Sequence, residues 1–113
     1  MLIAMLEEAV AGDESGASME AARAALAAGE WEVAREFFQA SLDEAPSAAA
    51  FEGLGVACRW LGEQEAAMRA LRRAYRLHRR AGDARGAARV ALQLCFGECY
   101  FHADVAVGLG WIE

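Results

Sequence analysis

The sequence has no lysine and no threonine, a single proline and few β-branched side chains, and these absences already restrict its fold. Strands favour β-branched residues, which lose χ1 freedom in helices. Pro46 is the only proline, and proline is the residue type most strongly disfavoured inside a helix. Alanine is instead abundant, and it loses no side-chain entropy in a helix. We therefore expect an all-α protein, and 113 residues correspond to one domain.

The sequence also lacks the features of a secreted or membrane protein. Cys58, Cys95 and Cys99 are an odd number and too few for a disulfide scaffold, which favours a reducing compartment. No apolar run reaches the ~18–20 residues of a membrane span. The apolar start Met1–Leu6 has no basic residues before it and is followed by Glu7-Glu8, unlike a signal peptide. We expect a cytoplasmic protein without membrane contact.

Charge is distributed unevenly along the chain. The net charge is -6, with 13 acids and 3 Arg in residues 1–66 but 4 acids and 8 Arg in residues 67–113. The overall acidity argues against direct binding of nucleic acid. The uneven distribution predicts that charge influences assembly and the choice of partner. The exclusive use of arginine suggests a coding bias and hints at a bacterial source.

An internal repeat is visible at an offset of 33 residues. Gly29-Glu30 aligns with Gly62-Glu63, and further along Ala34 aligns with Ala67 and Phe38 with Leu71. A further offset of 41 gives a weaker third copy at Asp104, Gly108 and Ile112. Small residues recur where two helices must approach closely, and large residues recur where side chains must fill the space between the paired helices.

Each copy follows another amphipathic stretch. Phe51, Leu54, Gly55 and Cys58 have the spacing of one helix face, and the same spacing recurs at Leu92, Cys95, Phe96 and Cys99. Gly29, Pro46, Gly62 and Gly82-Asp83 interrupt the helical runs. We predict a short helix at 2–10, a loop at 12–18 and the helix pairs 19–28/31–44, 48–61/64–81 and 85–102/104–112. Ser18, Ser47 and Asp104 are the expected N-caps.

These residues resemble the tetratricopeptide repeat. The resemblance is carried by Phe51-x2-Leu54-Gly55-x2-Cys58 followed by Gly62, Ala67, Leu71 and Ala74, and by Ala34-x3-Phe38 with Pro46. It implies a short right-handed α-solenoid of about three hairpins at 15–47, 48–88 and 89–113, after an N-terminal extension at 1–14. It also implies a non-catalytic module that binds a protein or peptide without a cofactor.

The third unit resembles the long repeats of bacterial LuxR-type and related signalling regulators. The similar segments are 81–89, with the sequence AGDARGAAR, and 108–112, with the sequence GLGWI. In such regulators the repeats accompany a DNA-binding or catalytic module. The resemblance therefore implies a role in bacterial transcriptional regulation or signalling.

In the repeat family the first helix of each pair lines a concave groove that holds the partner. Carried over position by position, the resemblance implies a groove formed by Arg23, Leu26, Glu52, Val56, Arg59, Trp60, Gln93, Tyr100 and Phe101. Trp, Tyr and Arg are the residue types that dominate binding hot spots. The alternative is that Trp60 and Phe101 only fill gaps between stacked helices.

Arginines recur every three or four residues between 64 and 81, and two interpretations are open. They could meet an anionic partner. The stronger interpretation is a solvated, partly paired face, because Glu36 and Asp43 align with Arg69 and Arg76, and Glu65 stands four residues before Arg69.

Cys95, Cys99 and His102 share one helix face and give an alternative function as a metal or redox sensor. A zinc site would need ligands from a second element, and no second Cys or His pair exists, so a structural role for the cysteines is favoured. No catalytic constellation is recognised, and the protein is expected not to be an enzyme.

Apolar residues near both ends of the chain predict self-association. The ends of a repeat stack need polar caps, whereas this chain has apolar residues there. A homodimer or a larger homo-oligomer would cover them, and the contact residues are expected to be Leu2, Leu6, Leu109, Trp111 and Ile112. A purely structural oligomerisation domain is therefore a further alternative.

Overall fold

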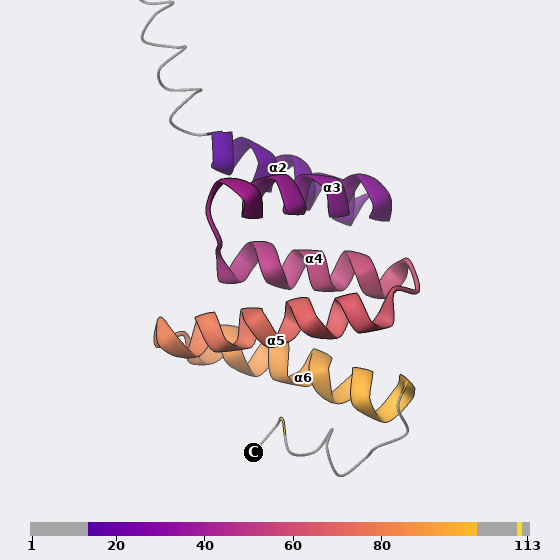
Figure 1. Ribbon diagram of the computed structural model, residues 1–113, viewed down its shortest axis with the longest axis vertical. Helices are drawn as coiled ribbons and strands as arrows, with labels where there is room; N and C mark the ends of the chain where they lie inside the picture. Colours follow the sequence, from indigo (N-terminus) through magenta and orange to yellow (C-terminus); the bar gives the residue numbers. More distant parts are fainter. Residues whose placement is uncertain (1–13, 102–110, 112–113) are drawn as a thin grey trace, which may run out of the picture.

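The computed structural model describes residues 14–101 and residue 111, and within them it contains only helices (Figure 1). The helices are α2 (Glu14–Ala27), α3 (Trp31–Glu44), α4 (Ala48–Trp60), α5 (Gln64–Arg80) and α6 (Ala84–Phe101). The all-α prediction is confirmed for this part of the chain. The predicted helices at 2–10 and 104–112, and the expected cap Asp104, lie outside the described residues.

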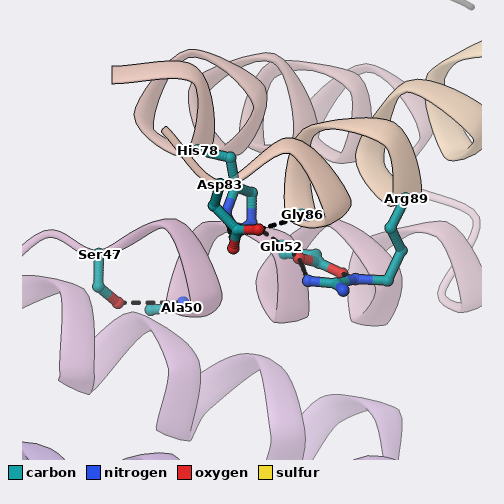
Figure 2. Close-up of polar contacts among 7 residues, drawn as sticks. All are labelled: Ser47, Ala50, Glu52, His78, Asp83, Gly86 and Arg89. Atoms are coloured by element: carbon teal, nitrogen blue, oxygen red, sulfur yellow. Dashed lines mark hydrogen bonds and ion pairs between the residues drawn. The ribbon is translucent and has the colours of Figure 1, made fainter. Parts of the chain in front are cut away.

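The helix boundaries match the predictions closely except at the first helix. The predicted loop at 12–18 is wrong where it can be compared, because α2 already begins at Glu14. Ser18 therefore lies inside α2 and is not its N-cap. Gly16 costs a helix only ~1 kcal/mol relative to alanine, and the alanines and glutamates around it favour the helix. Ser47 is an N-cap as predicted, since its hydroxyl accepts a hydrogen bond from the Ala50 N–H at 3.1 Å (Figure 2).

The same turn closes α2, α4 and α5. Gly29, Gly62 and Gly82 have φ angles of 77°, 80° and 74°, which favour glycine. In the second of these turns the N–H of Glu63 donates to the carbonyl of Cys58 at 2.9 Å, and the N–H of Gly62 donates to that of Arg59 at 3.1 Å. This is the Schellman arrangement, and the other two turns repeat its bonds. The predicted interruptions at these glycines are confirmed.

The helices stack in chain order. Each helix packs against the next one along the chain, and α2 also contacts α4. Figure 1 shows α4 in the middle, with α2 and α3 on one side of it and α5 and α6 on the other. Because α3 and α5 both run antiparallel to α4, they point in the same direction.

Close helix contacts depend on small residues. Phe38 and Leu71, which align in the sequence, are both almost fully buried. A Cβ on Gly53 would lie 2.2 Å from the Phe38 ring, and a Cβ on Gly55 would lie 2.6 Å from Leu71. The prediction that small residues recur where helices approach closely is confirmed at Gly55, whereas the pattern did not single out Gly53. Two apolar clusters result, one around Phe38 and the other around Leu71, and the half-buried Phe51 joins them.

The expected equivalence between the apolar faces of α4 and α6 is wrong. The alignment placed Leu92 and Phe96 on the buried face of α6, but they are 53% and 56% exposed. The helix buries Val90 and Leu94 instead, together with Gly97, whose Cβ would lie 2.4 Å from the Met68 sulfur. The reason is that α6 packs against α5 through the face that carries Val90, Leu94 and Gly97, which is rotated around the helix from the face of Leu92 and Phe96.

Candidate protein-binding surfaces

The groove residues implied by the resemblance occupy different environments. In α2, Arg23 is exposed, while Leu26 is half-buried against the first apolar cluster. Val56 of α4 is also half-buried. Tyr100 and Phe101 belong to the last turn of α6, and their side chains lie outside the described part of the chain.

Four polar side chains connect α4 to α6 directly. Arg59 donates a hydrogen bond to Gln93 at 3.1 Å. Glu52 accepts two hydrogen bonds from the guanidinium of Arg89, at 2.5 and 2.9 Å. Three of these residues, Glu52, Arg59 and Gln93, belong to the predicted groove, so the structure brings them to the same α4–α6 boundary. There they contact other side chains of the chain, which limits their availability to a partner.

Glu52 also belongs to a network centred on His78 (Figure 2). The buried imidazole places Nε2 3.1 Å from Glu52 Oε1 and Nδ1 3.3 Å from Asp83 Oδ2. Asp83 in turn accepts a hydrogen bond from the Gly86 N–H at 2.9 Å, at the start of α6. The network therefore ties the end of α5 to both α4 and α6.

The carboxylates of this network favour their charged forms. Partial burial alone would raise the pKa of Glu52, but the hydrogen bonds from Arg89 and His78 outweigh it and hold the pKa below its ordinary value. The Gly86 N–H lowers the pKa of Asp83. These shifts accompany a structural ion network at the turn between α5 and α6.

Trp60 is the most exposed large apolar residue of the described chain, at 64%. Its indole stacks on that of Trp31, with ring centroids 5.1 Å apart and planes 10° apart. Trp31 was not among the predicted groove residues. Both tryptophans stand beside hairpin turns in the sequence, but only the packing of α4 against α3 shows that the two turns meet.

A groove lies between α3 and α5, and sequence reasoning did not identify it. It has a volume of about 990 Å³. Phe51, Leu54 and Cys58 of α4 form its floor. We call it the α3–α5 groove. Its walls are helices with different charge, and the residues that line them are Glu36, Gln39, Ala40, Asp43, Ala66, Arg69, Arg72, Arg73 and Arg76, with Arg35 and Glu63 at one end.

The predicted ion pairs across these walls are not formed within the described chain. Glu36 and Asp43 make no ion pair with Arg69 or Arg76, and the expected pair of Glu65 with Arg69 is absent as well. The reason is that α4 lies between α3 and α5 and holds them apart, so that a groove takes the place of the pairs. The aligned residues line the same groove, but the alignment did not include the separation of the helices.

Other arginines of this region do have partners. Arg35 pairs with Glu63 at one end of the groove. Arg72 pairs with the buried carboxylate of Glu98 in α6, at 3.0 Å. The guanidinium of Arg73 lies over the Phe51 ring, 5.1 Å from its centroid, which is a cation–π contact. The α5 arginines are thus partly paired, as the sequence predicted, but with different residues.

The cysteines of α6 are close together. Cys95 Sγ and Cys99 Sγ are 4.0 Å apart, and both residues are half-buried. His102 lies outside the described residues. Within residues 14–101 and 111, no three Cys, His, Asp or Glu side chains are grouped so that they could hold a metal ion.

Of the predicted oligomer contacts, only Trp111 can be located. Its ring meets Tyr75 of α5 edge-on, with centroids 5.2 Å apart, and packs on the second apolar cluster. It also borders a hollow of about 480 Å³ between α5 and α6. Leu2, Leu6, Leu109 and Ile112 lie outside the described residues.

Comparisons of the chain with protein-family models, with curated proteins and with solved structures gave no match. None of the helices in the described part of the chain is long and apolar enough to cross a membrane. The comparisons thus add no family or activity to the features described above.

Proposed function

We propose that this chain is a short stack of helical hairpins of the tetratricopeptide type that binds another protein and catalyses no reaction. The proposed architecture is a right-handed α-solenoid of about three hairpins. Three features support it: the packing of each helix on its successor, the contact between α2 and α4, and the turn repeated at Gly29 and Gly62. We further propose a cytoplasmic role in bacterial regulation or signalling, on the basis of the sequence resemblance.

The observation that carries the binding function is the indole pair of the exposed Trp60 and the half-buried Trp31. Stacked aromatic rings usually lie in a core, whereas Trp60 leaves 64% of its surface to solvent. A rigid aromatic pair loses little conformational entropy when a partner covers it, and Trp is enriched in binding hot spots.

Affinity capture from cells of the source organism, with the full chain as bait, tests this function. Trp60→Ala should weaken capture of a specific partner by ~30-fold, the effect of losing a hot spot of ~2 kcal/mol. Arg85→Ala, at an exposed position in the first turn of α6, is the matched surface control and should capture the partner normally. Equal capture by the wild type and Trp60→Ala would exclude the indole pair as the binding surface.

A metal or redox sensor is a second candidate, and the 4.0 Å separation of the Cys95 and Cys99 sulfurs is the observation that favours it. Elemental analysis of the purified protein separates the two functions. Stoichiometric zinc or iron would support the sensor, because the protein-binding module needs no metal.

Self-association is a third proposal, as a homodimer that covers apolar residues near the ends of the chain. Light scattering at tens of micromolar tests it, and a monomeric mass would contradict it. A dimer that captures no partner would favour the purely structural alternative.

A further inference from the structure

The floor of the α3–α5 groove is an apolar strip along α4. Phe51, Leu54 and Cys58 are spaced by three and four residues, so they follow one helix face for about 10 Å. Burial, with a smaller contribution from the Glu63 carboxylate, raises the pKa of the Cys58 thiol. The thiol is therefore neutral and acts as a small apolar group in this floor.

The two walls of the groove carry opposite charge. The α3 wall has the exposed carboxylates of Glu36 and Asp43, and Asp43 accepts a hydrogen bond from Gln39 at 3.1 Å. The α5 wall has Arg69, Arg73 and Arg76, none of which has an acidic partner among the described residues. These arginines are four and three residues apart, so they follow the groove in a row.

We propose that the α3–α5 groove is the docking site for an amphipathic helix of a partner protein. Its apolar face lies on Phe51 and Leu54, its acidic edge faces the arginines of α5, and its basic edge faces the carboxylates of α3. The proposal rests on the proposed protein-binding function, but it uses a surface separate from the indole pair of Trp31 and Trp60.

The dimensions of the groove suit a helix. Two turns of a helix are about 11 Å long and about 10 Å across, and they occupy a volume comparable to the groove's 990 Å³. Two helices that run in the same direction also present ridges between which a third helix can pack. An extended peptide could not bind here by adding a strand to a sheet edge, since the described chain contains no strand.

The charges select the kind of partner. Acidic residues three and four apart along one edge of the docked helix would match the spacing of Arg69, Arg73 and Arg76. A nucleic acid is disfavoured, because the carboxylates of Glu36 and Asp43 would repel its phosphates. Complementary charge on both edges also fixes the direction in which the helix lies.

A designed peptide tests the proposal on the full chain. The probe is a fluorescein-labelled helical peptide with leucines on one face, glutamates along one edge and arginines along the other. The control peptide has the same composition and the same leucine face, but glutamates and arginines alternate along both of its edges, so that neither direction of docking matches the charges of the walls. Fluorescence anisotropy should show the probe binding at least ~10-fold more tightly than the control, with affinity that falls as salt is added. Equal binding of the two peptides would overturn the proposal.

Substitutions in the chain test whether the peptide binds in the groove. Arg69→Ala and Arg76→Ala should each weaken binding of the probe by ~3–10-fold, the loss of one well-placed charge contact. Arg85→Ala removes the same charge outside the groove and should bind normally. Ala40→Trp should fill the groove and abolish binding, whereas Ala24→Trp on the exposed face of α2 should not. Unchanged affinity in the double variant of Arg69 and Arg76, with helical circular dichroism intact, would overturn the proposal.

Two other occupants are distinguished in the same assay. A synthetic peptide of residues 1–13 that displaces the probe would show that the groove holds a segment of this chain, and it would overturn the proposal. A concentration-dependent mass that falls to that of the monomer when the probe is added would show a second copy in the groove and would also overturn it. If Trp60→Ala loses cellular capture while the wild-type chain does not bind the probe, the proposed function is retained and only this groove is rejected.

Discussion

Gly86 lies against His78 so closely that a Cβ on the glycine would stand 2.4 Å from the imidazole Nδ1. The same Cβ would lie 2.6 Å from Asp83 Oδ2. The absence of a side chain at the start of α6 is therefore what allows the imidazole to reach both Glu52 and Asp83. Since α6 begins at this point, the contact also sets the position of α6 relative to α5.

Gly86→Ala is expected to destabilise the protein, although alanine normally stabilises a helix relative to glycine by ~1 kcal/mol. The methyl group would displace the imidazole from its two carboxylates, with a cost of about 1–3 kcal/mol for overpacking. Urea denaturation followed by circular dichroism measures the change in the free energy of unfolding.

The control for Gly86→Ala is the same substitution in a His78→Ala background. Without the imidazole only the contact with the Asp83 carboxylate remains, so part of the clash is removed. Gly86→Ala should therefore cost less in that background than in the wild type. If it costs as much there as in the wild type, contact with His78 is not the cause.

Glu52→Gln should remove a pH-dependent contribution to stability. Partial burial opposes the charged carboxylate, but the hydrogen bonds from Arg89 and His78 hold its pKa below the ordinary 4.5 in the folded protein. A lowered pKa contributes stability that is fully present above pH ~5 and is lost as the pH falls through the folded-state pKa. The variant should therefore be less stable by ~1.5–3 kcal/mol at pH 7, as expected for hydrogen bonds to a charged group.

The difference between wild type and Glu52→Gln should shrink from pH 5 toward pH 3, as measured by urea denaturation at each pH. Glu65→Gln makes the same chemical change on an exposed side chain outside the network and controls for it. A difference that stays constant between pH 7 and pH 3 would show that the charge of Glu52 does not stabilise the fold.

Gly53→Ala tests the close contact between α3 and α4. The added Cβ would meet the Phe38 ring at 2.2 Å, and the buried ring has little room to move. A cost of about 2 kcal/mol is expected. For a domain of this size it should lower the melting temperature by ~4–16 °C, which a circular dichroism melt measures.

A smaller residue opposite Gly53 should relieve the clash. Phe38→Leu alone removes buried apolar surface and destabilises the protein, but combined with Gly53→Ala it should cost less than the sum of the two changes. Strict additivity would contradict a direct contact between residues 38 and 53.

Local patterns in the sequence were sufficient for the helices and their turns. Gly29, Gly62 and Gly82 mark helix ends because the turn requires a positive φ angle there. Glycine adopts this angle more readily than other residue types, so its presence in the sequence indicates the turn. The pairing of small and large residues also repeats at a fixed offset, so that the burial of Phe38 and Leu71 could be predicted. These features depend on residues near one another in the chain.

Features that depend on the separation of helices could not be predicted in the same way. The sequence aligned Glu36 with Arg69 but did not show that α4 separates α3 from α5, so pairs were expected where the structure has a groove. The buried face of α6 was missed because α6 follows the surface of α5, where Gly97 meets Met68, and not the pattern of α4. Similarly, Trp31 and Trp60 meet only because two turns are adjacent in space.

The stacked indoles of Trp31 and Trp60 allow an optical prediction. Two parallel rings 5.1 Å apart should interact electronically and give a paired signal of opposite signs in the far- and near-ultraviolet circular dichroism. Trp60→Phe should abolish this signal, because a phenyl ring absorbs at different wavelengths. The free energy of unfolding should change by only ~0.5–1.5 kcal/mol, the contribution of an aromatic pair beyond its buried area.

Trp111→Phe is the matched control, because Trp111 meets Tyr75 and not another tryptophan. The paired signal should survive in this variant and vanish in both Trp31→Phe and Trp60→Phe. A partner that covers the indoles should shift the tryptophan fluorescence of Trp111→Phe toward shorter wavelengths. If the signal persists without Trp31, the two rings are not stacked in solution, and the surface proposed for partner binding loses its rigidity.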